Sequence, residues 1–457
     1  MNIVAPDLIP ALDPNPLPAP YWVFKLLLVV TFFLHIVAMN FMLGGALLAL
    51  AARMGRKGSR GLKGKKLRSR GVKELSSPEL EVSTRGADQL SSSTSQLLNS
   101  STPQLLDPST LPHGSRLFRD LAHKLPSLLP ATITLGIAPL LFVQVLYGQF
   151  FYTSSIILAW PWFLVLVFLT LAYYGFYYVS LKTGTGFSAS ALVGADDAQA
   201  AGAAGKVPRV FLLSVLLIVA IGFIYSNNLT LSQTPARWAQ KYFARPTGWN
   251  LNLAEPTLFP RFLHFLVAAV AVGGLLLVLI AWANWQRDPA YARYVFEFGG
   301  KAFLHATMAQ FLVGIAFVLS LPRPMQMLFF GDSPLATLLL IAGIAGALGS
   351  IYLMFEALRR EDVRLAARYV TAITAAVILV MSILRATLRD AYLKPNFRPQ
   401  QFLVSTQWSV LPLFLVLFAG GVALWLVMLR RYGLLGGPRA ASQAGPVKPE
   451  AGSDGWG

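Results

Sequence analysis

The chain has 457 residues, of which 55% are hydrophobic and only 13% are charged. A soluble domain carries about 25% charged residues, so this composition excludes an ordinary soluble protein and indicates a membrane protein. Because the chain has no cysteine, structural disulfides, cysteine-ligated zinc or iron–sulfur clusters and c-type haem are also excluded within it. The net charge of +18 could indicate binding to nucleic acid, or it could reflect basic loops on the cytoplasmic side of a membrane protein. The position of the basic residues in the chain has to decide between these two explanations.

Nine apolar stretches are each long enough to cross a bilayer, which takes about 20 helical residues. Their length and their Leu, Val, Ala and Phe content favour helices over the short alternating strands of a β-barrel. In chain order they lie near residues 21–52, 126–150, 156–182, 208–227, 260–285, 301–321, 334–358, 365–389 and 405–430. The sequence therefore predicts an all-α integral membrane protein with nine transmembrane helices.

Basic residues indicate how these helices are oriented. Ten Lys/Arg and no acidic residue lie between Arg53 and Lys73, directly after the first stretch. Every second loop carries basic residues in the same way, as far as Arg430 and Arg431 after the ninth stretch. The positive-inside rule then predicts an N-terminus outside and a C-terminus in the cytoplasm. The positive charge is explained by topology, and no nucleic-acid partner is expected.

The chain divides into membrane and polar parts. Residues 1–53 hold the N-terminal segment and first helix, and residues 117–432 hold the other eight helices. Residues 54–116 are rich in Ser and Thr and contain an octapeptide repeated in tandem at 92–107, which predicts a disordered cytoplasmic insert. The Gly-rich residues 433–457 predict a disordered cytoplasmic tail.

Two further loops have distinctive compositions. Residues 189–206 are rich in Ala and Gly and predict a flexible cytoplasmic linker. The outside loop at 227–260 carries aromatic residues such as Trp238 and Trp249 together with several prolines. This composition predicts an ordered cap on the membrane surface. Its aromatic residues form either an interfacial belt or a surface on which a partner docks.

Ionisable side chains within membrane helices are costly and are therefore functional candidates. His35 lies roughly 20 Å into the first helix, His264 at the outer end of the fifth and His305 at the inner end of the sixth. Each histidine either ligates haem b or forms an ordinary interhelical hydrogen bond. Arg385 and Arg389, at the outer end of the eighth helix, either bind haem propionates or extend to lipid headgroups.

The surroundings of two histidines are alike. A Gly-Gly pair at 44–45 follows His35 by nine and ten residues, and another at 273–274 follows His264 by the same spacing. Glycines permit close approach of either a neighbouring helix or a flat macrocycle. The spacing alone does not distinguish these two roles.

Three segments carry a resemblance to a known family. The first helix reads LHIVAMNFMLGGALLAL at 34–50, with His35 ahead of a Leu-Gly pair, and the second reads LGIAPLLFVQVLYG at 135–148. The run from Pro256 through His264 to the turn at Arg287 keeps a similar spacing. These segments resemble subunit I of cytochrome bd quinol oxidase, a family with nine helices and an external N-terminus. The resemblance is distant and rests on spacing more than on identities.

The resemblance implies a subunit in the bacterial inner membrane that holds one or more b haems. His35 and His264 fall on haem-ligand positions, and Met39 or another side chain nearby would assist. His305 could bind a separate haem. The family also implies a quinol site and pairing with other membrane redox subunits, so we expect a hetero-oligomer in lipid.

Several family residues are absent. Gln144 stands at the place of the second-helix Glu, and residues 160–165 contain no acid. The seventh-helix Met falls near Ala342, and the Glu that ligates the high-spin haem falls near Thr387. Buried carboxylates usually relay protons, so we do not expect a proton-coupled oxygen reductase.

The leading functional hypothesis is a bd-like membrane cytochrome b subunit that passes electrons between the quinol pool and an outside carrier such as a c-type cytochrome. That carrier has to be a separate chain, because this one has no cysteine. The alternative is a haem-free structural or anchor subunit of a membrane redox complex. A secondary transporter is a third reading, but the two halves show none of the similarity that such proteins have.

Overall fold

The computed structural model describes residues 9–11, 15–70, 112–184, 198–407 and 409–431. Within these ranges the regular secondary structure is helical, with two isolated β-bridges and no strand. Eight of the described helices are long and apolar enough to cross a membrane. These helices confirm the predicted class, a multi-pass α-helical membrane protein.

The long helices follow the predicted apolar stretches in order. They are α1 (Tyr21–Arg70), α3 (His113–Leu158), α4 (Trp160–Gly184), α6 (Ala198–Ser232), α8 (Leu258–Asn284), α9 (Pro289–Ser320), α11 (Pro334–Arg360) and α13 (Thr371–Leu393). The short helices are η3 (Pro235–Arg237), α7 (Trp238–Ala244), α10 (Arg323–Met327), η4 (Leu328–Asp332), α12 (Val363–Leu365), η5 (Ala366–Val370) and η6 (Pro399–Gln401). Together α12, η5 and α13 form one span, Val363–Leu393.

The ninth predicted stretch corresponds to α14 (Val410–Arg431). Its apolar part, Val410–Leu424, is shorter than the other spans, so a ninth membrane crossing stays a prediction. The orientation of the helices in the membrane stays a prediction as well.

Two segments predicted to be unstructured are partly helical. Helix α1 continues to Arg70 and α3 begins at His113, so both ends of the predicted 54–116 insert are helical. Helix α6 begins at Ala198, inside the predicted 189–206 linker. Alanine is the strongest helix former, which accounts for this extension of α6. The middle of the insert, the first half of the linker and the 433–457 tail lie outside the described residues.

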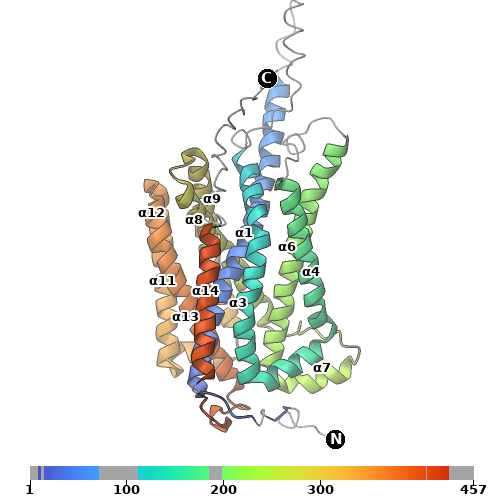
Figure 1. The fold of residues 1–457 in the computed structure, drawn as a ribbon, viewed down its shortest axis with the longest axis vertical. Helices are drawn as coiled ribbons and strands as arrows, with labels where there is room; N and C mark the ends of the chain where they lie inside the picture. The colour runs from blue at the N-terminus through green and yellow to red at the C-terminus, as the bar shows by residue number, and fades with distance from the viewer. Residues whose placement is uncertain (1–8, 12–14, 71–111, 185–197, 408, 432–457) are drawn as a thin grey trace, which may run out of the picture.

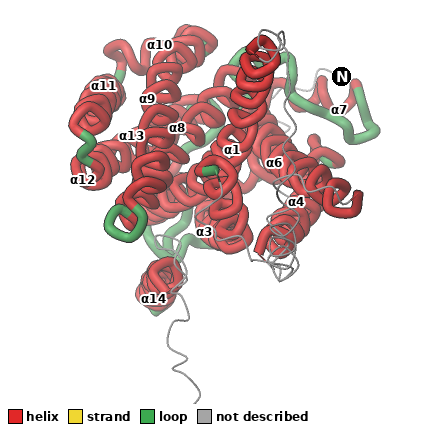
Figure 2. Tube along the Cα trace, turned by 90° about the horizontal axis from the view of Figure 1, so that it is seen from above, coloured by secondary structure: helices red, strands yellow, loops and turns green. Residues whose placement is uncertain are grey.

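The bundle is built from pairs of adjacent helices. Helix α8 packs along α9, α1 along α3, α4 along α6, and α11 along α13, while α1 also packs against α8 in the middle (Figure 1). Figure 2 shows α14 standing apart at the edge of the bundle. In Figure 1, α7 lies at the lower end and α12 at the upper end, which is the end of the basic loops.

Gly44, Gly45 and Gly273 lie at the contact between α1 and α8, whereas Gly274 faces α9. A Cβ atom on Gly44 would lie 1.8 Å from the carbonyl oxygen of Ala269, and one on Gly273 would lie 2.5 Å from the carbonyl carbon of Gly44. The glycines therefore allow helix packing, which decides between their two predicted roles. Because three spans separate α1 from α8, the two helices run parallel. Equal spacing from this contact places His35 and His264 at the same depth.

We predict that Gly44→Ala destabilises the bundle, because the new methyl group meets backbone atoms of α8 that cannot move aside. The expected cost is about 1–3 kcal/mol or more, as for other overpacked cores. Gly349→Ala is the matched control, since nothing lies within 4 Å of a Cβ atom at that position of α11. Thermal unfolding in detergent measures both variants. Equal unfolding temperatures would contradict the close α1–α8 contact.

The loop at 227–260 is an ordered cap. Trp238 is buried and its indole N–H donates to the carbonyl of Leu231 at 2.8 Å. The side-chain oxygen of Asn227 accepts from the backbone N–H of Asn252 at 2.8 Å. Trp249, by contrast, is 52% exposed and stacks with Trp160. The cap thus has a polar interior and an aromatic outer edge, which leaves both predicted roles of its aromatic residues open.

Candidate functional site

His264 lies in the first turns of α8 and packs against α9. Its Nδ1 atom is buried and has no hydrogen-bond partner within the described part of the chain. A Cβ atom on Gly314 would lie 3.7 Å from the imidazole, and the ring of Phe317 lies 6.3 Å away. The side chain of Gln310 donates to the carbonyl of His264 at 3.0 Å and leaves its own oxygen unpaired. His264 is therefore not held by an ordinary interhelical hydrogen bond.

His35 lies at the same depth on α1 and faces α3. Its Nδ1 is 3.1 Å from the carbonyl oxygen of Thr132. A carbonyl only accepts, so Nδ1 carries the proton and Nε2 keeps a free lone pair in the neutral ring. Gly136 permits this approach, because a Cβ atom there would lie 2.8 Å from the imidazole. An imidazole oriented through Nδ1–H in this way is the usual arrangement of a histidine that ligates a metal.

Three arginines gather at the end of the bundle that is predicted to face outside. Arg261 and Arg389 are buried and Arg385 is partly buried. Each has at least one buried guanidinium nitrogen without a hydrogen-bond partner, and within the described residues none of the three forms an ion pair. Each guanidinium lies over an aromatic ring: Arg261 over Phe317 at 5.1 Å, Arg385 over Phe32 at 4.0 Å and Arg389 over Tyr147 at 4.9 Å.

These contacts join the arginines to the two histidines. Arg261 precedes His264 by one turn of α8, and both side chains pack against Phe317. Arg385 reaches Phe32, which precedes His35 by one turn of α1. We call Arg261, Arg385 and Arg389 the arginine cluster.

Nearby acidic groups do not neutralise the cluster. Asp390 follows Arg389 directly, but its carboxylate pairs with Lys25 and accepts a hydrogen bond from Tyr147 at 2.7 Å. Tyr147 in turn is 3.0 Å from the hydroxyl of Tyr21.

Glu255, which lies in the cap near Arg261, pairs with Arg237 at 3.0 Å. Both acids that act on the cluster therefore have other cationic partners. A buried cation without a counter-ion costs several kcal/mol, and the three like charges also repel one another. The cluster is an arrangement that an anionic ligand would stabilise.

The remaining predicted residues are placed as follows. Met39 is partly buried one turn beyond His35, on the same face of α1. His305 is exposed, and its Nδ1 is 2.7 Å from the carbonyl of Lys301 in its own helix. It lies about 13 Å along α9 from Gly314, the residue that faces His264. The structure thus groups His35, His264, Arg385 and Arg389, and it leaves His305 apart from them.

Arg385 and Arg389 do not extend to the surface as headgroup-binding side chains do. Arg261 was not predicted as a site residue from the sequence, although its spacing of three residues from His264 places both residues on one helix face. Tyr392 was missed as well, and its hydroxyl is buried without a partner within the described residues. Those residues also contain no cluster of His, Cys, Asp and Glu that could hold a bare metal ion.

Comparison with known proteins places the fold but not the family. No family model matches the chain, and no curated protein matches it in sequence. The fold is similar to that of bd oxidase from Geobacillus thermodenitrificans, with a TM-score of 0.52 and 12% sequence identity. The similarity covers 91% of this chain and 100% of that one. The chain therefore has a distant bd-oxidase-like fold.

Proposed function

We propose that the chain is a bd-like membrane cytochrome b subunit that passes electrons between a quinol pool and a carrier outside the membrane. The observation that carries the proposal is the arginine cluster together with His264: within the described part of the chain, each arginine has a buried guanidinium nitrogen without a partner, and so has the imidazole Nδ1. Buried polar groups of this kind are rare in native proteins and call for an explanation. An anionic, iron-containing ligand explains both features together.

The residues present fit haem b. Haem b requires a histidine or similar axial ligand for iron, and its two propionates require cations or hydrogen-bond donors. His264 and the arginine cluster supply this set at one end of α8. His35 supplies an axial ligand at a second position, with Met39 on the same face. Haem b, when bound, supplies a one-electron carrier.

The protein's own groups then set the properties of the site. The carbonyl of Thr132 fixes the tautomer of His35. The arginine cluster binds carboxylates and favours the more negative, reduced state of a nearby carrier. The aromatic rings of Phe32, Tyr147 and Phe317 cover the guanidinium groups and exclude water from them.

Electron transfer is favoured over oxygen reduction for this chain. The solved structure with a similar fold is an oxidase, but by the family resemblance Gln144 stands here in place of one glutamate of the bd family, and a second glutamate falls near Thr387. The cluster lies at the predicted outer end, which suits a donor or acceptor outside the membrane. A c-type cytochrome on a partner chain is a carrier of this kind, and other membrane redox subunits would complete the complex.

Anaerobic reduction of the purified protein in liposomes tests this function. Addition of a short-chain quinol is expected to produce a reduced haem b spectrum, and oxidised cytochrome c is then expected to reverse it. The same protein without quinol is the control. Failure of the quinol to reduce a haem that dithionite does reduce would contradict a quinol-linked role. Rapid reoxidation by oxygen with formation of water would indicate an oxidase instead.

A further inference from the structure

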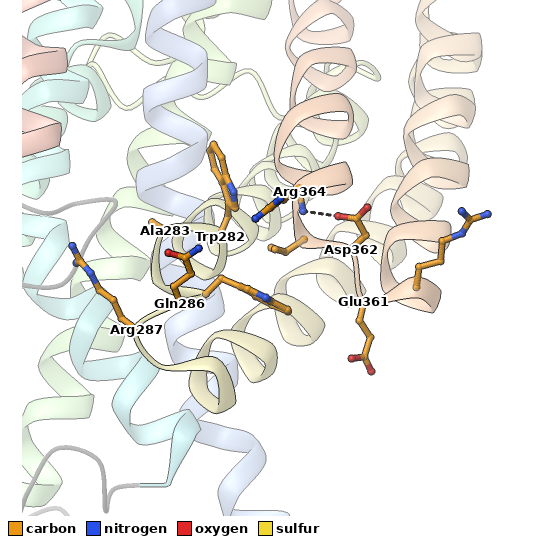
Figure 3. A pocket seen from close by; sticks show the side chains of 10 residues that line it. Trp282, Ala283, Gln286, Arg287, Glu361, Asp362 and Arg364 are labelled. Atoms are coloured by element: carbon orange, nitrogen blue, oxygen red, sulfur yellow. Dashed lines mark hydrogen bonds between the residues drawn. The ribbon is translucent and has the colours of Figure 1, made fainter.

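An open pocket of about 820 Å³ lies at the basic end of the bundle, away from the arginine cluster. It is formed between the turn that joins α8 to α9 and the turn that joins α11 to α12 (Figure 3). Its lining residues are Trp282, Ala283, Trp285, Gln286, Arg287, Arg360, Glu361, Asp362, Val363 and Arg364. In Figure 3, Arg364 points towards Trp282, and Arg287 lies on the opposite side, beyond Gln286.

The acidic residues of the pocket are engaged elsewhere. The carboxylate of Glu361 pairs with Arg293 on α9. The carboxylate of Asp362 accepts from the backbone N–H groups of Arg364 and Leu365, each at 3.0 Å, and so caps the following helix. Neither carboxylate is therefore available to a cation inside the pocket.

The basic residues of the pocket are less fully paired. Arg360 pairs with Glu356 on its own helix. Within the described ranges, no ion pair involves the guanidinium group of Arg287 or Arg364. Both are exposed, and they come from the two different turns. The pocket thus has an exposed arginine on each side, and an anion bound in it would attract both of these long side chains.

The wall of the pocket is aromatic. Trp282 is 41% exposed, and Trp285 packs its ring against Phe296 at 6.0 Å. These residues lie where an apolar helix gives way to charged residues, so the pocket is at the level of lipid headgroups. Basic pockets between helices on the cytoplasmic side bind anionic phospholipid headgroups. An aromatic wall beside two cations suits an amphiphile better than a free anion.

We propose that this pocket binds the phosphate of an anionic phospholipid from the inner leaflet, with Arg287 and Arg364 contacting the phosphate and Trp282 contacting the glycerol and upper acyl chain. Such a lipid would connect the α8–α9 hairpin to the α11–α13 hairpin. The proposal is independent of haem binding. Free phosphate shares the same chemistry, and competition between the lipid and inorganic phosphate distinguishes the two sources.

Native mass spectrometry of the full chain, titrated with phosphatidylglycerol or phosphatidylcholine, tests the proposal. Phosphatidylglycerol is expected to bind the wild type at least tenfold more tightly than phosphatidylcholine. Arg287→Gln/Arg364→Gln is expected to lower the affinity for phosphatidylglycerol roughly tenfold or more, since each basic residue contributes at the membrane surface. Arg287→Lys/Arg364→Lys retains both charges and should retain most of the affinity.

Lys206→Gln/Arg209→Gln is the matched control, because it removes two exposed positive charges at the same end on α6. This variant is expected to bind phosphatidylglycerol as the wild type does. An equal loss in the control, or no preference for the anionic lipid, would overturn the proposal. Displacement of phosphatidylglycerol by an equal concentration of inorganic phosphate would also overturn it, because the ligand would then be the free anion.

Discussion

Replacement of His264 with Ala is expected to remove one b-type haem from the purified protein. The imidazole is buried at the contact between α8 and α9, and its Nδ1 has no protein partner within the described residues. If it ligates iron, its loss leaves the arginine cluster without the ligand that the site is built to hold. We expect occupancy of that haem site to fall by more than tenfold, measured as haem per protein with a pyridine haemochrome assay. His35→Ala is expected to remove a second, separate haem.

Two controls distinguish the loss of an iron ligand from a general loss of folding in the His264→Ala variant. His305→Ala changes an exposed histidine whose Nδ1 contacts the Lys301 carbonyl of its own helix, and it should leave the haem content unchanged. His264→Gly with added imidazole should regain the haem signal, since the free base can occupy the vacated ligand position. A variant that loses haem, keeps its size-exclusion profile and is not restored by imidazole would argue against a ligand role for His264.

Arg385→Gln/Arg389→Gln is expected to lower the haem midpoint potential. Reduction adds one negative charge to the site, so nearby cations stabilise the reduced form and their removal destabilises it. At an effective dielectric constant of about 20, one charge at roughly 10 Å contributes on the order of 1.5 kcal/mol, or about 60 mV for a one-electron couple. We therefore expect a fall of about 100 mV for the double variant, measured by redox titration.

The same variant is expected to affect the haem-free protein in the opposite sense. Because each guanidinium group has a buried nitrogen and no counter-ion among the described residues, their replacement should stabilise the apoprotein while it weakens haem binding. Lys206→Gln/Arg209→Gln removes the same charge at the far end and should change neither property. An unchanged potential in the cluster variant would contradict a haem beside these arginines.

Much of the fold could be predicted, because membrane-spanning helices are recognisable from the length and hydropathy of their sequences. The eight described spans follow the first eight predicted stretches. The matching nine-residue spacing from each histidine to a glycine pair also had a real structural basis, the parallel contact of Gly44 with Gly273. Helix ends were less predictable, because the Ala-rich segment before Lys206 reads as a linker by composition and as helix by propensity.

Only some residues of the candidate site could be predicted from the sequence. His35, His264, Arg385 and Arg389 stand out as ionisable residues in apolar helices. What could not be predicted is which charges meet across the bundle. The pairing of Lys25 with Asp390 joins residues far apart in the chain, and it engages the acidic residue next to Arg389, which has no counter-ion among the described residues. A single sequence carries no information on such long-range pairs.

Haem binding by this chain is tested by a dithionite-reduced minus oxidised spectrum of the wild-type protein, purified in mild detergent from cells with ample haem. We expect the sharp α-band of haem b and at least one haem per chain by pyridine haemochrome assay. A colourless protein under these conditions would contradict it. The chain would then be a haem-free structural or anchor subunit that keeps a bd-oxidase-like bundle.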